Sequence, residues 1–96
     1  MENIVIDPQV KMLMESAALG MAAKEFMACD FGKHIVSKAS AEVDQALSEL
    51  IECPPGDAEQ IRSIQNRVHV AQSAVRWLVE AINEGDNAMR DLDEEN

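Results

Sequence analysis

The clearest pattern in the sequence is a run of apolar positions between Asp57 and Gly85. Spacings of three and four residues alternate along this run, through Ile61, Ile64, Val68, Ala71, Val75, Leu78 and Ile82. Such spacing places all seven side chains on one side of an α-helix, and it is typical of a helix that packs along another helix. We therefore predict a helix over residues 58–84, and we call this stripe the seam.

A second apolar strip runs beside the seam on the same predicted helix, through Val70, Ala74, Trp77 and Ala81. Together the two stripes make an apolar face too wide for a two-stranded coiled coil, so we expect this helix to pack against two others. Trp77 fits two roles. It either fills the core between three helices or anchors a contact with another protein, because tryptophan is enriched at interface hot spots.

The boundaries of this helix are marked by proline, aspartate and glycine. Pro54 and Pro55 cannot continue a helix, so residues 53–57 are predicted to form a short loop between antiparallel helices. Asp57 is a good cap for the next helix. Gly85 predicts its end.

The seam spacing nevertheless continues beyond Gly85, to Met89 and Leu92. We therefore expect a further short helix over 86–92 on the same packing surface.

A second seam precedes the loop, through Val36, Ala39, Val43, Ala46 and Leu50. It predicts a helix over 31–52 that pairs with the helix after the loop. Asp30 is the expected cap at its start, and Gly32 lowers helix propensity there. A single long helix bent at this point is the alternative.

The first predicted helix, residues 8–29, is apolar on most of its faces. Asp7 and Pro8 provide its start. A helix of this kind is either central in a bundle or buried between subunits. Since 96 residues provide little protein to cover it, we expect a homo-oligomer formed through this helix. The candidate protein interface comprises Leu13, Ala17, Met21 and Phe26, with Trp77.

These elements predict an all-α fold in a single domain over residues 1–96. It is a helical hairpin or small bundle of three main helices with a short C-terminal helix. The composition agrees, because alanine, methionine, leucine and glutamate favour helices and the chain has no tyrosine.

The formal charge is −10. This balance argues against direct binding to nucleic acid or to an anionic membrane surface, and it suits a basic partner. The apolar stretch of the first helix is interrupted by charged residues, such as Lys11 and Glu15, which excludes a membrane span. Acidic residues gather near the C-terminus as a candidate nucleic-acid-mimicking patch, formed by Glu80, Glu84, Asp86, Asp91, Asp93 and Glu94.

No pattern of reactive or metal-binding residues accompanies these helices. His34 and His69 have no ligand partner at helical spacing, and no phosphate-binding glycine loop occurs. Cys29 is the best candidate for a reactive thiol because it precedes a predicted helix start, but a structural thiol is favoured over it. We therefore predict no enzyme activity, no metal and no cofactor.

Four segments carry a resemblance to a known group of proteins: residues 26–33, 39–50, 57–67 and 77–85. They resemble small all-helical proteins encoded in tailed-phage genomes. The resemblance extends over roughly residues 20–92, and it rests on packing residues and helix caps. It implies a phage or prophage origin and brings no catalytic residues. It also implies a location in the cytoplasm of an infected bacterial host or in the virion.

From these observations we expect a non-enzymatic phage-type protein that acts by protein–protein contact. Its partner would be a virion component, as for an assembly accessory, or a host protein that it modulates. The alternative is an acidic inhibitor that imitates nucleic acid and blocks a host defence or DNA-processing protein.

Overall fold

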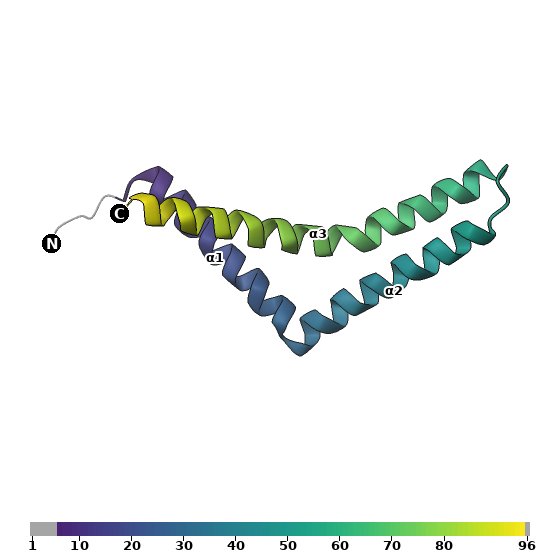
Figure 1. The fold of residues 1–96 in the computed structure, drawn as a ribbon, viewed down its shortest axis with the longest axis horizontal. Coiled ribbons are helices and arrows are strands. Elements are labelled where there is room, and N and C mark those ends of the chain that lie inside the picture. Colours follow the sequence, from purple (N-terminus) through teal and green to yellow (C-terminus); the bar gives the residue numbers. More distant parts are fainter. Residues whose placement is uncertain (1–5, 96) are drawn as a thin grey trace.

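The computed structural model describes residues 6–95, which form three α-helices and, within that range, no strand. They are α1 (Pro8–Ala28), α2 (Asp30–Glu52) and α3 (Ala58–Glu95). Figure 1 shows that α1 and α2 form a V, and that α3 runs along its open side and crosses α1 near the C-terminal end. The predicted all-α class is confirmed.

The caps expected from the sequence hold two of the helix starts. The Asp7 carboxylate accepts a hydrogen bond from the Gln9 amide at 2.8 Å, and Pro8 occupies the first turn of α1. The Asp57 carboxylate accepts one from the Gln60 amide at 3.1 Å at the start of α3. In both cases the side chain satisfies an amide that has no partner inside the helix.

The elbow between α1 and α2 is a true break at Cys29, so a single bent helix is wrong. Cys29 has extended backbone geometry, and its Sγ accepts a hydrogen bond from the Gly32 amide at 3.3 Å. Cys29 is therefore the cap of α2, and the expected cap, Asp30, is its first helical residue. Gly32 is required here because a Cβ on it would lie 1.5 Å from the carbonyl oxygen of Phe26.

The two predicted seams meet where the loop over residues 53–57 joins α2 to α3, which we call the closed end of this pair. The buried core there consists of Ala46, Cys53 and Ile64, with Leu50, Ile61 and Val68 packed around it. Ala46 is 0% exposed and Ile64 is 4% exposed. An ion pair between Arg67 and Glu49 joins the two helices beside this core.

The third helix is continuous, so the predicted stop at Gly85 and the separate short helix over 86–92 are wrong. Gly85 has no positive φ angle, as a C-terminal glycine cap would require. It lies where α3 crosses α1, and a Cβ on Gly85 would come within 2.8 Å of the Gly20 Cα. The glycine therefore serves the close approach of two helices and does not end one.

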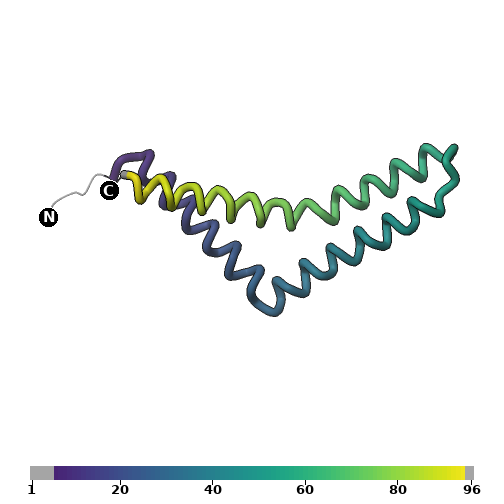
Figure 2. The backbone as a smooth tube through the Cα atoms, in the orientation of Figure 1, coloured from purple at the N-terminus to yellow at the C-terminus, as the bar shows by residue number. Residues whose placement is uncertain are grey.

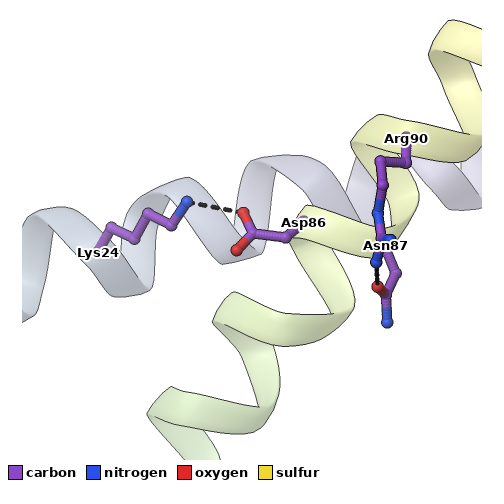
Figure 3. Close-up of polar contacts among 4 residues, drawn as sticks. All are labelled: Lys24, Asp86, Asn87 and Arg90. Carbon is purple, nitrogen blue, oxygen red and sulfur yellow. Dashed lines mark hydrogen bonds and ion pairs between the residues drawn. The ribbon is translucent and has the colours of Figure 1, made fainter.

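Beyond residue 80, α3 packs on α1 around the second strip. Gly85 and Ala88 are buried there. Of the predicted seam positions in this part, Ile82 and Leu92 are half-buried and Met89 is exposed. On the other side of the crossing α1 contributes Ala17, Gly20 and Ala23. Small residues on both helices let the two backbones approach closely. Figure 3 shows Lys24 of α1 bridging to Asp86 of α3 beside the crossing, and Arg90 bonded to Asn87, one turn away along α3.

The resulting molecule is long and open. It measures 70 × 29 × 23 Å, and its radius of gyration is 19.7 Å. A compact domain of this length would have a radius of gyration of about 12–13 Å. Figure 2 shows the cause, because α1 and α2 meet α3 at its two ends and lie away from its middle at the elbow. The three helices therefore do not pack side by side along their whole lengths.

Candidate protein-contact surfaces

The main surface feature of the described chain is the amount of apolar side chain that its own fold leaves exposed. Twelve large hydrophobic residues are exposed: Ile6, Met12, Met14, Leu19, Met21, Phe31, Leu47, Ile51, Val70, Trp77, Val79 and Met89. Single exposed hydrophobics are ordinary. Here, however, twelve large ones are exposed, whereas the buried hydrophobic residues of the described chain are four alanines, Cys53 and Ile64. Such a balance is typical of surfaces that bind another molecule.

The interface predicted on the first helix is divided by the fold. Ala17 is buried against α3, Leu13 and Phe26 are half-buried, and Met21 is exposed. The Phe26 ring packs edge-on against the Phe31 ring at the elbow, with centroids 6.3 Å apart. Of the predicted set on this helix, only Met21 offers a largely free side chain.

The exposed apolar residues of α1 lie on both flanks of its contact with α3. Met12 and Leu19 are seven residues apart and share one flank, and Met14 and Met21 share the other. Methionine is unbranched and polarizable, so it adapts its shape to a partner and is over-used at binding surfaces. The two flanks of α1 are therefore the candidate surfaces for contact with a different protein.

Trp77 does not fill a core. Its side chain is 66% exposed, and Val70, one strip position away from Ala74, is 67% exposed. The reading of Trp77 as core filler is wrong for the single chain. The strip itself is real, but the described fold covers only its C-terminal continuation, where Ala88 packs against α1.

A cleft separates α2 from α3 between the closed end and the elbow. Its volume is about 470 Å³, and it is lined by seam residues of both helices. These are Val36, Ala39 and Val43 of α2 and Ala71 and Val75 of α3, with Ser40, Gln72 and Arg76 at the rim. The seams predicted to close on each other thus diverge here, since the elbow draws the start of α2 away from α3.

The acidic patch lies on the C-terminal half of α3. Glu80, Glu84, Asp91, Asp93 and Glu94 are all exposed. Asp86 is exposed as well, but its carboxylate accepts from the Lys24 ammonium at 2.7 Å. Five of the six predicted members are therefore exposed on one continuous helix and do not take part in the ion pair.

The charges of α3 are segregated along its length. Three arginines and no acidic residue occur between residues 60 and 79, whereas residues 80–95 hold seven acidic residues and one arginine. Sequence reasoning noted the acidic end but missed this contrast, which a count along the helix would have found. It also missed the Gly20–Gly85 crossing, although the small residues at 81, 85 and 88 continue the second strip.

The two thiols have different environments. Cys29 is exposed at the elbow and Cys53 is buried at the closed end. Burial raises the pKa of the Cys53 thiol, and the negative charge of Asp57 raises it further. Cys53 is therefore held as a neutral thiol, in keeping with a packing role.

No cluster of three or more metal-binding side chains occurs among residues 6–95, and His34 and His69 are both exposed there. None of α1, α2 or α3 combines the length and apolar character needed to cross a bilayer.

Comparison with protein-family models, characterised proteins and solved structures found no match for this chain.

Proposed function

We propose that this is a non-enzymatic, phage-type protein that acts by binding another protein. The observation that carries the proposal is the exposed apolar surface of α1, with Met12 and Leu19 on one flank and Met14 and Met21 on the other. Such side chains favour burial by roughly 25 cal/mol per Å² of apolar area. The partner is a virion component or a host protein, and the contact takes place in the infected cell or in the virion.

Each flank of α1 suits a partner that lays an apolar helix or loop along it. The flanks are separated by the buried face that holds α3, so a partner is expected to occupy one flank or to straddle the end of the helix. Around the partner's site lie Lys11, Glu15 and Glu25, all exposed, which would form the polar rim of the interface.

The test is a binding comparison between the natural chain and a variant with one flank made polar. Purified protein is immobilised and exposed to phage-infected host lysate and, separately, to dissociated virions. The variant is Met14→Gln with Met21→Gln. The matched control is Lys11→Gln with Glu25→Gln, which changes two exposed polar residues of the same helix.

A specific partner that is retained by the natural chain and the control, and lost by the methionine variant, supports the proposal. The second flank is tested in the same way with Met12→Gln and Leu19→Gln. If both flank variants retain every bound protein, α1 is not the contact surface. If no protein is retained specifically from either source, the proposed function is overturned.

A second candidate function is imitation of nucleic acid, favoured by the five exposed carboxylates on the C-terminal half of α3. An acidic helix of this kind would compete with DNA for a basic groove, and its binding would weaken as salt is raised. Displacement of labelled DNA from basic host DNA-binding proteins tests it. The triple change Asp91→Asn, Asp93→Asn and Glu94→Gln should abolish displacement and leave contact through α1 unchanged.

A further inference from the structure

We propose that the exposed strip of α3, formed by Val70, Ala74 and Trp77, is the interface of an antiparallel dimer between two copies of this chain. The proposal goes beyond the proposed function because it names a surface other than α1 and commits to its occupant. It stands independently of whether α1 binds a different protein.

The first argument is the amount of uncovered surface. The chain exposes 7518 Å², whereas a compact folded chain of 10.6 kDa exposes about 5,500 Å². The six residues outside the described range contribute less than about 1,000 Å² of this difference, even at the area of an unfolded chain. About 1,000 Å² or more per chain is left, which is the area that each partner of a stable homodimer buries.

The second argument is continuity with a contact that already exists. Positions 70, 74, 77, 81, 85, 88 and 92 follow one another at spacings of four and three and hold only apolar or small residues. Its C-terminal part, at Gly85 and Ala88, is buried against α1. Its N-terminal part is the exposed strip. One stripe of α3 is thus half covered within the chain, and another helix is needed to cover the rest.

The third argument is charge, and it selects a second copy in the antiparallel orientation. Residues 60–79 of α3 carry a formal charge of +3 and residues 80–95 carry −6. An antiparallel pair centred on Ala74 places the arginine-bearing half of each α3 beside the acidic half of the other α3. Arg67 is already paired with Glu49 of α2, so Arg62 and Arg76 are the cations that face the partner's carboxylates. A parallel pair would place like charges together, which is unfavourable.

The register around Ala74 brings particular side chains together. Arg62 lies twelve residues before Ala74 and Glu84 lies ten residues after it, at distances of about 18 and 15 Å along the helix. Arg62 and Glu80 are eighteen residues apart, a whole number of helical turns, and Glu84 follows one turn later, so all three share one flank of the strip. Two Arg62–Glu84 pairs form across the two-fold axis. Both residues are exposed and belong to neither ion pair found within residues 6–95.

The sequence alone predicts self-association through the first helix. The charge pattern of α3 and its half-covered stripe favour α3 as the dimer interface instead. In this arrangement the half of one copy in which α2 packs on α3 lies beside the half of the other copy in which α1 crosses α3. Helix α1 is therefore adjacent to the dimer interface without forming it. Each exposed Trp77 then becomes an anchor close to the two-fold axis.

The test is sedimentation equilibrium of the full chain from low to high micromolar concentration, with circular dichroism to verify folding. The natural chain is expected to form a dimer. Ala74→Glu places two carboxylates at the axis and should raise the dissociation constant by about 100-fold or more. Asn83→Glu is the matched control: it adds the same charge nine residues away, on the opposite side of α3, and should leave the dimer intact.

A charge exchange tests the register. Arg62→Glu and Glu84→Arg should each raise the dissociation constant by about tenfold, since two pairs are reversed in each dimer. The double variant should restore the natural affinity. A chain that stays monomeric, a dimer insensitive to Ala74→Glu, or a double variant as weak as the singles would overturn the proposal. So would a dimer lost on changing Met12 and Leu19 of α1 to glutamine while Ala74→Glu has no effect, because the interface would then lie on α1.

Discussion

At the scale of single residues, the crossing of α1 and α3 depends on two glycines that the sequence presents as punctuation. A Cβ on Gly85 would lie 2.8 Å from the Gly20 Cα and 3.0 Å from the carbonyl oxygen of Ser16. Both contacts are with backbone, so the helices would have to move apart. We predict that Gly85→Ala lowers the free energy of unfolding by about 1–3 kcal/mol, although alanine favours helices by about 1 kcal/mol.

Urea denaturation measures this change, and Gly56→Ala is its control. A Cβ on Gly56 would meet nothing within 4 Å, and its φ angle is not positive. That variant should leave stability unchanged or raise it by less than about 1 kcal/mol. If Gly85→Ala stabilised the protein to the same degree, the close crossing would be wrong.

The thiols provide a second prediction at this scale. We expect Cys29 to react with a thiol reagent at pH 8 in the folded protein and Cys53 to resist it. The exposed thiol meets the reagent directly. Burial and Asp57 raise the pKa of the Cys53 thiol, so its thiolate fraction at pH 8 is lowered. The Cys53→Ala variant should lose only the slow phase of labelling, and denaturant should make the two thiols of the natural chain react alike.

The raised pKa of Cys53 also sets the direction in which the stability of the fold depends on pH. Because folding raises the pKa of Cys53, its contribution to stability is complete below the thiol's ordinary pKa and is lost as pH rises through the folded value.

At the scale of helices, each face of α3 has a different task, and paired truncations should separate them. Ile64 is 4% exposed in the core between α2 and α3. We predict that Ile64→Ala lowers the free energy of unfolding by about 2–4 kcal/mol. Trp77→Ala should lower it by under about 1 kcal/mol when the chain is dilute, because the ring is 66% exposed.

Thermal melts at low micromolar concentration make the comparison. An equal loss in the two variants would return Trp77 to the core of the single chain.

The helices could be predicted from the sequence, because caps, prolines and apolar spacing are local features of the chain. Asp7 and Asp57 cap the helices as predicted, and α2 ends at Glu52, the residue expected from Pro54 and Pro55. The role of Gly85 could not be predicted. A glycine that ends a helix and a glycine that lets a second helix approach closely look alike in the sequence, until the position of the second helix is known. The seam packs as predicted at the closed end, through Ile61, Ile64 and Val68. Beyond residue 80, α1 packs on the neighbouring stripe through Gly85 and Ala88, and the seam position Met89 is left exposed. The exposed surfaces depend on where the arms of the V diverge, and no local pattern encodes that.

At the scale of the whole molecule, an open chain with a radius of gyration of 19.7 Å predicts that stability depends on protein concentration. If two copies associate through α3, unfolding converts one dimer into two chains, so mass action stabilises the folded state as concentration rises. A tenfold increase adds about 1.4 kcal/mol per dimer. With an unfolding entropy of about 2 cal/mol/K per residue over two chains, the melting temperature should rise by about 3–4 °C per tenfold increase in concentration above the dissociation constant.

Ala74→Glu should remove this dependence of the melting temperature on concentration, because a chain that melts as a monomer has a melting temperature independent of concentration. Asn83→Glu carries the same charge and should retain it. This dependence thus separates a surface that is merely exposed from one that a second copy covers.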